Sequence, residues 1–513
     1  MTRRPAAWLT LLLLLPACYD RPAALDAPLE GLASFALGPR LLFLRQSPAE
    51  AVLLDFAKPT PTRSAWPFDC DLGPSARLEG DRLALVCWGD ASELRVLGFD
   101  ADGAPTWTTY PLPSAYTSLV ASDDGRYVVG FFGPGASSGH LFQNASEVAV
   151  VDTAAEPSEA NPAARVLDLR DRDPLAVRIG PELSDQGTAR RLVVVEAPSL
   201  LAVFDLMQPG DDAQVVPLVP SGTLQQVTPN RLRFFTDRPD GRLELFVGAT
   251  PGTDIYDVLF TADPAGVGTV TPDLDASIRL LTLPAAPVDF QPFVDAKGQV
   301  RVAALSTATE DLVLFAPDQG LQRVNRMPYR FTALNAIARG DGQPHFLLSA
   351  PGDWQMGRLL ADFDVAEADA KSADTFTLVE LGDVATAVLP VEGSSTFLVQ
   401  HGTGALTLLD GRTHARSLVK ELGSIRDARL VGSTFHVLTD VGDGSAYGRL
   451  DVLHHQSVTV DVPGETSQFL GVGDDVTLFD LWSDEGGAVL GVRQGSDGAE
   501  VLEWRGFLLD GSL

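Results

Sequence analysis

The fold class is decided by two neighbouring runs, Arg191-Leu-Val-Val-Val-Glu196 and Leu200-Leu-Ala-Val-Phe-Asp205. Both runs are short and rich in Val and Leu, and a turn-forming Pro198-Ser199 separates them. Such a pair predicts two antiparallel strands joined by a turn. Similar pairs recur at residues 231–235 and 242–247, 300–305 and 311–315, 396–400 and 405–410, and 434–438 and 449–453. Because runs with an apolar face at helical spacing are scarce, the sequence predicts an all-β protein.

Asp-Gly dipeptides mark many of the expected turns, since both residues tolerate positive φ. They stand at 102–103, 124–125, 240–241, 341–342, 410–411, 443–444, 497–498 and 510–511. The strand units recur at about 40 to 60 residues, the spacing of four-stranded propeller blades. Unit starts are expected near Ala76, Tyr116, Asp173, Ser221, Pro287, Arg330, Val384, Ser424 and Thr466. Some are expected to merge, which predicts a single β-propeller of about seven or eight blades; an array of β-sandwich domains is the alternative.

Two stretches resemble known propeller families. Leu119-Val-Ala-Ser-Asp-Asp-Gly-Arg-Tyr-Val-Val-Gly-Phe131 resembles the Ser-Pro-Asp-Gly-Arg strand-turn-strand unit of WD40-like bacterial propellers, with Asp123 in place of the proline. Residues 148–153 then resemble the third strand of such a blade. Leu97-Gly-Phe-Asp-Ala-Asp-Gly-Ala-Pro-Thr-Trp107 is similar to the Asp-x-x-x-Gly-x-x-x-Trp repeat of quinoprotein-type propellers, with the glycine shifted. The resemblance implies a propeller fold and covers about a third of the chain at motif level.

The N-terminus resembles a bacterial lipoprotein signal. Arg3 and Arg4 precede an apolar run that is too short to span a bilayer, and Leu15-Pro-Ala-Cys18 closes it. The resemblance implies that Cys18 receives a diacylglyceryl group and becomes the first mature residue, so that lipid chains anchor the protein to a membrane. An ordinary secretory leader cut elsewhere is the alternative. The expected organisation is a signal peptide over residues 1–17, a lipidated N-terminus and tether over 18–30, and a propeller over 31–513.

The expected location is the bacterial cell envelope. Tyr19, and not an aspartate, directly follows Cys18, which favours the outer membrane by analogy with enterobacterial sorting. The remaining cysteines, Cys70 and Cys87, are then expected to form a disulfide in an oxidising compartment. Two buried free thiols are the alternative.

The charge balance excludes one class of partner. The formal net charge is -30, and it becomes -32 when the leader with Arg3 and Arg4 is removed. A field of that sign repels phosphate backbones, so no nucleic-acid partner is expected.

No motif supplies a convincing catalytic or metal site. Residues 135–139 satisfy G-x-S-x-G, but a strand-like run follows them where the nucleophile elbow needs a helix. His454 and His455 would point to opposite faces of a strand, and His401 and His414 flank a hairpin without further ligands. The Asp-Gly clusters lack the ligands of a calcium loop. No catalytic residue, metal site or cofactor is therefore predicted. The tryptophans at 66, 88, 107, 354, 482 and 504 are expected mostly to serve packing.

These observations favour a membrane-anchored binding or scaffold module that recognises a protein or glycan component of the envelope through loops on one face. The alternative is a propeller enzyme, a glycan or ester hydrolase or, with less support, a quinone-dependent oxidoreductase, whose carboxylates come from distant blades.

Overall fold

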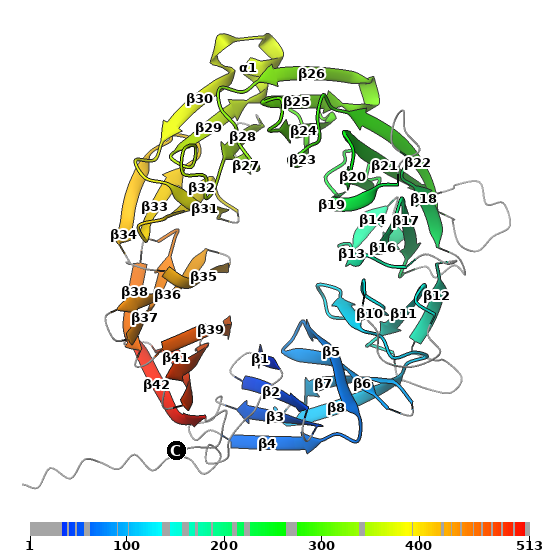
Figure 1. Ribbon diagram of the computed structural model, residues 1–513, viewed down its shortest axis with the longest axis vertical. Coiled ribbons are helices and arrows are strands. Elements are labelled where there is room, and N and C mark those ends of the chain that lie inside the picture. The colour runs from blue at the N-terminus through cyan, green and yellow to red at the C-terminus, as the bar shows by residue number, and fades with distance from the viewer. Residues whose placement is uncertain are drawn as a thin grey trace, which may run out of the picture. The chain divides into compact units, whose positions relative to one another are not determined.

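The computed structural model is built almost entirely of β-strands (Figure 1). It describes residues 33–507 except 38–39, 47–48, 56–61, 90, 101, 136–143, 156–163, 170–172, 186–187, 208–212, 220–225, 263–273, 338–343, 392, 422–424, 432, 442–443, 455, 463–464, 473–475, 484–485 and 496–497. Cys18 and the predicted boundaries after residues 17 and 30 lie outside this part of the chain. The chain forms two compact units, a larger one over Phe68–Gly464 and a smaller one that combines the residues up to Pro67 with those from Glu465.

The larger unit holds eight four-stranded antiparallel sheets in the described residues, which we number blades 1 to 8. Blades 1 to 4 consist of β5 (Asp71–Leu78), β6 (Arg82–Trp88), β7 (Glu93–Phe99) and β8 (Pro105–Pro111); β9 (Ser118–Ala121), β10 (Tyr127–Phe131), β11 (Glu147–Asp152) and β12 (Ala164–Asp168); β13 (Ala176–Ile179), β16 (Leu192–Ala197), β17 (Leu200–Asp205) and β18 (Gln214–Pro217); and β19 (Thr228–Phe235), β20 (Glu244–Thr250), β21 (Asp254–Ala262) and β22 (Leu274–Thr282). A separate hairpin of β14 (Leu183–Asp185) and β15 (Thr188–Arg190) is inserted in blade 3.

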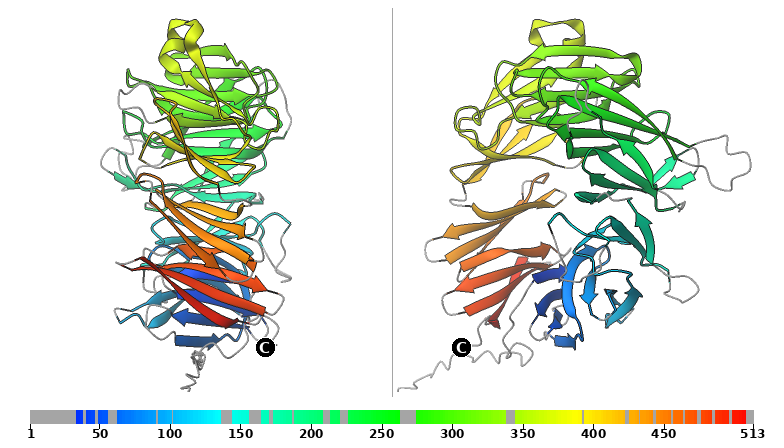
Figure 2. Two further views of the ribbon diagram at one scale, coloured as in Figure 1. Left: turned by 90° about the vertical axis from the view of Figure 1, so that its left-hand side faces the viewer. Right: turned by 45° about the vertical axis from the view of Figure 1, so that its right-hand side comes forward.

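Blades 5 to 8 follow in the same strand order. They consist of β23 (Asp289–Val294), β24 (Val300–Ser306), β25 (Asp311–Ala316) and β26 (Leu321–Arg326); β27 (Ala333–Ile337), β28 (His345–Ser349), β29 (Leu359–Asp364) and β30 (Phe376–Glu380); β31 (Ala385–Pro390), β32 (Thr396–His401), β33 (Ala405–Asp410) and β34 (Arg416–Glu421); and β35 (Ile425–Val431), β36 (Thr434–Val441), β37 (Gly444–Asp451) and β38 (Gln456–Val462). The short helices η2 (Pro317–Gln319), α1 (Val365–Ala370) and η3 (Ala373–Thr375) lie between third and fourth strands. Figure 2 shows α1 extending beyond the sheet of blade 6.

The smaller unit contains the two sheets nearest the chain ends. Its strands are β1 (Ala33–Leu37), β2 (Arg40–Gln46), β3 (Ala49–Asp55) and β4 (Thr62–Pro67), and β39 (Glu465–Val472), β40 (Val476–Ser483), β41 (Gly486–Gly495) and β42 (Gly498–Phe507). Each sheet comes from one continuous segment, and β1 lies beside β39.

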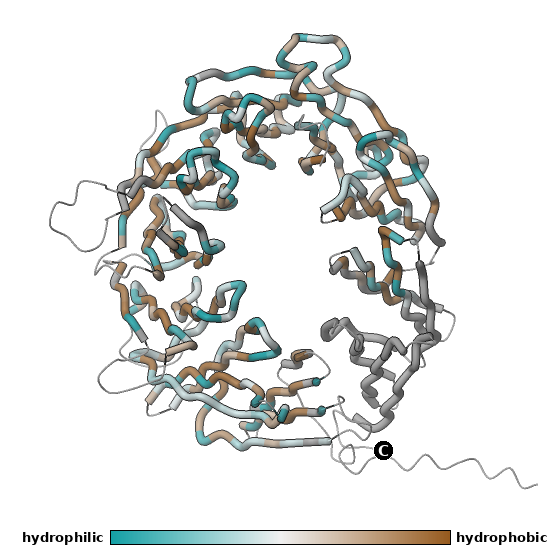
Figure 3. Tube along the Cα trace, turned by 180° about the vertical axis from the view of Figure 1, so that it is seen from behind, coloured by the Kyte–Doolittle hydropathy of each residue, from teal (hydrophilic) through white to brown (hydrophobic). Residues whose placement is uncertain are grey.

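The strand pair that decided the fold class forms the centre of blade 3. The runs at 191–196 and 200–205 become β16 and β17, which pair in register from Leu192 opposite Asp205 to Ala197 opposite Leu200. Every residue of both strands is buried. Residues that alternate between the two faces of a sheet are all buried only when both faces are covered. Both faces of these two strands are apolar, and blades 2 and 4 pack on them; Figure 3 shows the hydrophobic residues concentrated along the middle strands of the larger unit.

Hydrophobic clusters join every pair of consecutive blades in the larger unit. The cluster around Val193 joins blades 2 and 3, and the cluster around Val194 joins blades 3 and 4. Corresponding clusters join the other five pairs of neighbours. This arrangement confirms the all-β, four-stranded propeller class. It does not match an array of β-sandwiches, in which the sheets pack in pairs.

The predicted unit starts correspond closely to the blades. Each lies near the beginning of a separate first strand, and the largest offset is between Ser221 and Thr228 of β19. No two of them merge in the described residues. The larger unit alone holds eight blades, within the expected number, and the smaller unit adds two sheets.

The WD40-like stretch forms β9 and β10, as its resemblance implies. Gly125 adopts φ +63° in the turn between them, and a Cβ there would lie 2.7 Å from the backbone nitrogen of Glu79 in blade 1. A side chain at this position would therefore strain both the turn and the blade contact. No helix in the described residues is long and apolar enough to span a membrane.

We expect Phe246→Ala to destabilise the larger unit strongly. Phe246 is fully buried between blades 4 and 5 and makes an edge-to-face contact with Phe235. Its truncation should lower the free energy of unfolding by roughly 3–5 kcal/mol. Leu418→Ala, which changes an exposed residue of β34, should change it by less than about 0.5 kcal/mol. Urea unfolding followed by circular dichroism measures both, and equal midpoints for the two variants would contradict the interblade core.

Candidate functional site

The strand order of each blade gathers two kinds of connection at one end of its sheet. The loop between the second and third strands lies at the same end as the start of the first strand, and we call this end the entry end. Hydrogen bonds here join consecutive blades: Trp88 Nε1 donates to the Tyr116 carbonyl at 2.9 Å, and the Ser199 amide donates to the Val227 carbonyl at 2.8 Å. Successive blades of the larger unit therefore present their entry ends together.

Trp354 is the most prominent side chain at the entry end. It lies in the loop between β28 and β29 of blade 6, and it is 76 % exposed. The sequence predicts that most of the tryptophans serve packing, and Trp354 is one that does not. A tryptophan ring has a large apolar surface with one N–H donor, and tryptophan is enriched at the energetic centres of protein interfaces.

The loop holds Trp354 in an ordered turn. Asp353 Oδ1 accepts hydrogen bonds from the amides of Gln355 at 2.8 Å and Met356 at 2.9 Å. These bonds, first that from Met356 and then that from Gln355, lower the pKa of Asp353 below its ordinary value. The carboxylate therefore stays ionised at neutral pH. The Gly357 amide donates to the Asp353 carbonyl at 2.7 Å and closes the turn. The ring is thus presented without a large loss of loop entropy on binding.

Blade 7 supports the same loop from the side. The Gly352 amide donates to the Ala385 carbonyl, and the Ala385 amide donates to the Gly357 carbonyl, both at 2.8 Å. On the same blade, Asp383 accepts hydrogen bonds from Thr403 Oγ1 at 2.8 Å and from the Val384 amide at 2.7 Å. These two donors lower the pKa of Asp383. An ionised carboxylate is therefore fixed on the blade that anchors the Trp354 loop.

The connection from blade 5 to blade 6 adds further exposed groups at the entry end. Tyr329 is 37 % exposed. Glu310 accepts from Arg326 Nη2 at 3.0 Å and from Arg330 Nε at 3.1 Å. The entry ends of blades 5 to 7 thus combine two exposed aromatic rings with charged groups of both signs, a composition suited to binding a partner.

The opposite ends of the blades carry an ion-pair network whose central carboxylates are buried, whereas Arg279 and Asp318 at its rim are partly exposed. Glu244 and Asp257, on β20 and β21, are fully buried. Arg279 Nη2 lies 2.9 Å from Glu244 and 2.6 Å from Asp257, and Arg238 Nη1 lies 2.9 Å from Glu244. Both arginines reach Asp318 of blade 5, at 2.6 and 3.0 Å. The network ties blade 4 to blade 5, and its burial argues for a structural role.

Burial, reinforced by the charge of Glu244, raises the pKa of Asp257 to about 8. Perturbed pKa values also occur at catalytic sites. Here the carboxyl is enclosed by its ion-pair partners and has no solvent-exposed surface, so no substrate reaches it.

The histidines that the sequence singled out have separate partners. His401 Nε2 lies 2.9 Å from Thr407 Oγ1, whereas His414 Nε2 lies 2.9 Å from Asp362 of the preceding blade. Asp362 also bonds His345 Nδ1 at 3.0 Å, so its carboxylate joins blades 6 and 7. His454 contacts Asp451, and His455 lies outside the described residues. The hairpin does not bring His401 and His414 together into one site.

The remaining sequence candidates do not assemble a reactive centre in the described part of the chain. Most of the G-x-S-x-G stretch lies outside it. Asp100 caps its own turn by accepting from the amides of Asp102 and Ala104. Within the described ranges, no group of three or more His, Cys, Asp or Glu side chains is placed to hold a metal ion.

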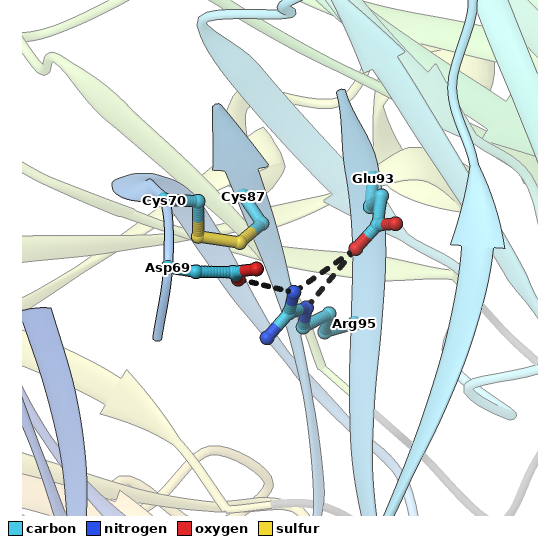
Figure 4. Close-up of a disulfide and its surroundings, with 5 residues drawn as sticks. All are labelled: Asp69, Cys70, Cys87, Glu93 and Arg95. Carbon is cyan, nitrogen blue, oxygen red and sulfur yellow. Dashed lines mark hydrogen bonds and ion pairs between the residues drawn. A yellow bond between two sulfur atoms is a disulfide. The ribbon is translucent and has the colours of Figure 1, made fainter. Parts of the chain in front are cut away.

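The structure joins Cys70 and Cys87 in a disulfide at the entry end of blade 1, with their Cα atoms 5.6 Å apart (Figure 4). Arg95 lies beside it and donates to Asp69 at 3.1 Å and to Glu93 at 3.1 Å. The Arg95 guanidinium also stacks 5.1 Å from the Phe68 ring. This cluster fixes the chain where the larger unit begins. Cys18 lies outside the described residues, so its lipidation stays a prediction.

Comparisons with known proteins do not assign the chain to a family. No family model and no curated protein matches the chain. Among solved structures, similar ones include the dihydro-heme d1 dehydrogenase NirN in complex with DHE (12 % identity, TM-score 0.40, 86 % of this chain and 79 % of that one). A eukaryotic initiation factor (10 %, 0.41, 83 % and 96 %) and BBS1N in complex with ARL6DN (12 %, 0.33, 67 % and 92 %) are also similar. Similarity this distant says nothing about ligand or activity. The blades themselves define the class, an all-β protein of the β-propeller type.

We expect the disulfide to stabilise blade 1. It links residues 17 apart in sequence, and its removal by Cys70→Ser with Cys87→Ser should lower the free energy of unfolding by roughly 3 kcal/mol. Thiol counting on the denatured, unreduced wild type measures the bond directly. Free thiols at both cysteines would contradict it.

Asp257 should make stability fall as pH rises. Its folded pKa of about 8 exceeds the ordinary value of 3.8, so between these pH values the native state binds a proton that the unfolded state lacks. The stabilisation is present below pH 3.8 and is lost as pH rises through about 8. The free energy of unfolding of wild type minus that of Asp257→Asn should therefore decrease from pH 5 to pH 8, by up to about 1.4 kcal/mol per pH unit, because the Asn side chain stays neutral and does not titrate.

The matched control for this pH series is Asp353→Asn. The pKa of Asp353 is lowered, so the residue is ionised in both states throughout the range and should add no slope. Parallel curves for wild type and Asp257→Asn would contradict the raised pKa.

Proposed function

We propose that this protein is a lipid-anchored, exported β-propeller of the bacterial envelope that binds a partner through the entry ends of blades 5 to 7. The observation that carries the binding role is Trp354, which is 76 % exposed and yet held in a turn by the Asp353 carboxylate and by blade 7. A ring that is both rigid and uncovered contributes much contact area at little entropic cost. No observation favours the enzyme alternative.

The partner that fits this surface best is a protein of the envelope. Trp354 and Tyr329 provide apolar anchors, and the entry ends of the same three blades also carry the charged groups Arg330, Glu310 and Asp383. Protein interfaces commonly combine a desolvated aromatic centre with a polar rim. A glycan would also stack on the rings, and the experiment below separates the two.

The lipid anchor rests on the Leu15-Pro-Ala-Cys18 sequence and on its resemblance to lipoprotein signals. Acyl chains on Cys18 would hold the propeller at a membrane, with the outer membrane favoured because Tyr19 follows the cysteine. The protein would then present its loops to components of the same compartment.

Trp354→Ala should weaken partner binding at least about tenfold, since truncating an interface anchor commonly costs more than 1.4 kcal/mol. The full-length protein is cross-linked in envelope membranes, and the cross-linked species whose yield depends on Trp354 is identified. The affinity of the partner in that species for the detergent-solubilised wild type and for Trp354→Ala is then measured by titration. Leu418→Ala, on an exposed fourth strand, is the control and should retain the species. Mass spectrometry of the cross-linked species identifies a protein partner by peptides of a second chain and a glycan partner by carbohydrate attached to peptides of this chain. Equal yields for the two variants would overturn the proposed binding surface.

Cys18→Ser should abolish lipid incorporation, because the thiol is the acylated atom in this family of signals. Mass spectrometry of the N-terminal peptide and membrane fractionation provide the readouts. The variant should remain uncleaved or appear in the soluble fraction of the export compartment. A cleaved Cys18→Ser protein that still fractionates wholly with membranes would show that the anchor lies elsewhere.

A further inference from the structure

The first strands of blades 4, 5 and 6 bring two arginines and one carboxylate together. β19, β23 and β27 lie beside one another at the same edge of their sheets (Figure 1). Arg231 and Arg233, two residues apart on β19, share the face of blade 4 that packs toward blade 5. Both contact Asp289 at the start of β23.

Asp289 is already occupied by other donors. Its Oδ1 accepts from the Phe290 amide at 2.8 Å as well as from Arg231, and its Oδ2 accepts from the Leu334 amide of blade 6 at 3.0 Å. The side chain is only 9 % exposed. This carboxylate thus links three consecutive blades and has little capacity left for a second guanidinium.

Arg233 is consequently short of acceptors. Its only contact with Asp289 is a 3.4 Å hydrogen bond through Nη2, and its Nε has no hydrogen-bond partner. The Arg233 side chain is 41 % exposed and that of Arg231 is 38 % exposed. Two guanidiniums thus face one saturated carboxylate, which leaves one uncompensated positive charge at an accessible position.

We propose that Arg231 and Arg233 form a binding site for a carboxylate group. A single carboxylate supplies one negative charge, which balances the surplus, and two oxygens, which match the paired N–H donors of a guanidinium. Because both arginine side chains are partly exposed, at 38 % and 41 %, a carboxylate in solution can reach them. In a chain of net charge -30, a local positive site also discriminates among ligands, because a molecule with many negative charges is repelled by the remainder of the protein.

This site is independent of the Trp354 surface. It lies along β19 and β23 of blades 4 and 5, whereas Trp354 lies in a loop of blade 6. Loss of one site should therefore leave the other unchanged.

The test uses acetate as the probe and inorganic phosphate as the comparison, each against sodium chloride at equal ionic strength. A ligand that binds only the native state raises the unfolding midpoint in proportion to the logarithm of its concentration. We expect acetate to raise the midpoint of the full-length wild type above that in chloride, and Arg233→Gln to require about tenfold more acetate for the same rise, the loss of one charge-assisted pair. Arg242→Gln, whose guanidinium pairs with Asp240, is the control and should behave as wild type.

Arg233→Gln keeps the experiment informative even if Arg231→Gln disturbs folding, because Arg233 makes only the long contact with Asp289. Equal acetate effects in wild type and Arg233→Gln would overturn the proposal. A larger effect of phosphate than of acetate, lost in Arg233→Gln, would refute the carboxylate and indicate a phosphate site. If Trp354→Ala lost the acetate effect, the independence of the two sites would be wrong.

Discussion

The middle strands of blades 3 and 5 are buried on both faces, and the packing of the larger unit depends on this constraint. Strands such as β16 and β17 bury every residue, so one covered face is not sufficient for them. Such a blade needs a neighbour on either side, and the clusters shared between consecutive blades of the larger unit are the main source of its stability. A blade in isolation would expose two apolar faces, which explains why this repeat occurs many times in succession.

Arginine provides the polar connections between blades in this acidic chain. Arg279 and Arg238 reach Asp318 across one boundary, Arg191 bonds Asp124 across another at 2.6 Å, and Arg301 bonds Asp369 across a third at 2.6 Å. A planar guanidinium has five donors in a fixed fork and can pair with several carboxylates at once, two of them bidentately, whereas a lysine ammonium has three donors and no planar fork. Many of the acids at these boundaries are thus paired with an arginine, and the exposed aromatic rings lie in other loops, at the entry ends.

The repeat could be predicted from the sequence because its signals, the strand runs and the turns, each lie within a few neighbouring residues. Alternating runs and Asp-Gly turns located the start of nearly every first strand, although the segment that forms β1–β4 gave no separate unit start. The candidate site could not be found in the same way. Tryptophan is most often a packing residue, and only the Pro351-Gly352-Asp353 turn beside Trp354 signals an exposed loop. Asp289 meets Arg231 and Leu334 through packing of whole blades, which leaves no local pattern in the sequence.

The smaller unit has a mechanical consequence. In the described residues each of its sheets is built from one continuous segment, so no strand is exchanged there between the two chain ends. β1 is an edge strand that pairs with β2 within its own sheet, and its backbone lies beside β39. A force that pulls on the chain ahead of Ala33 would act on β1 first and break its hydrogen bonds to β2 one pair after another. Because β1–β4 precede the larger unit in the chain, this sheet would unfold before the force reaches the blades that follow it.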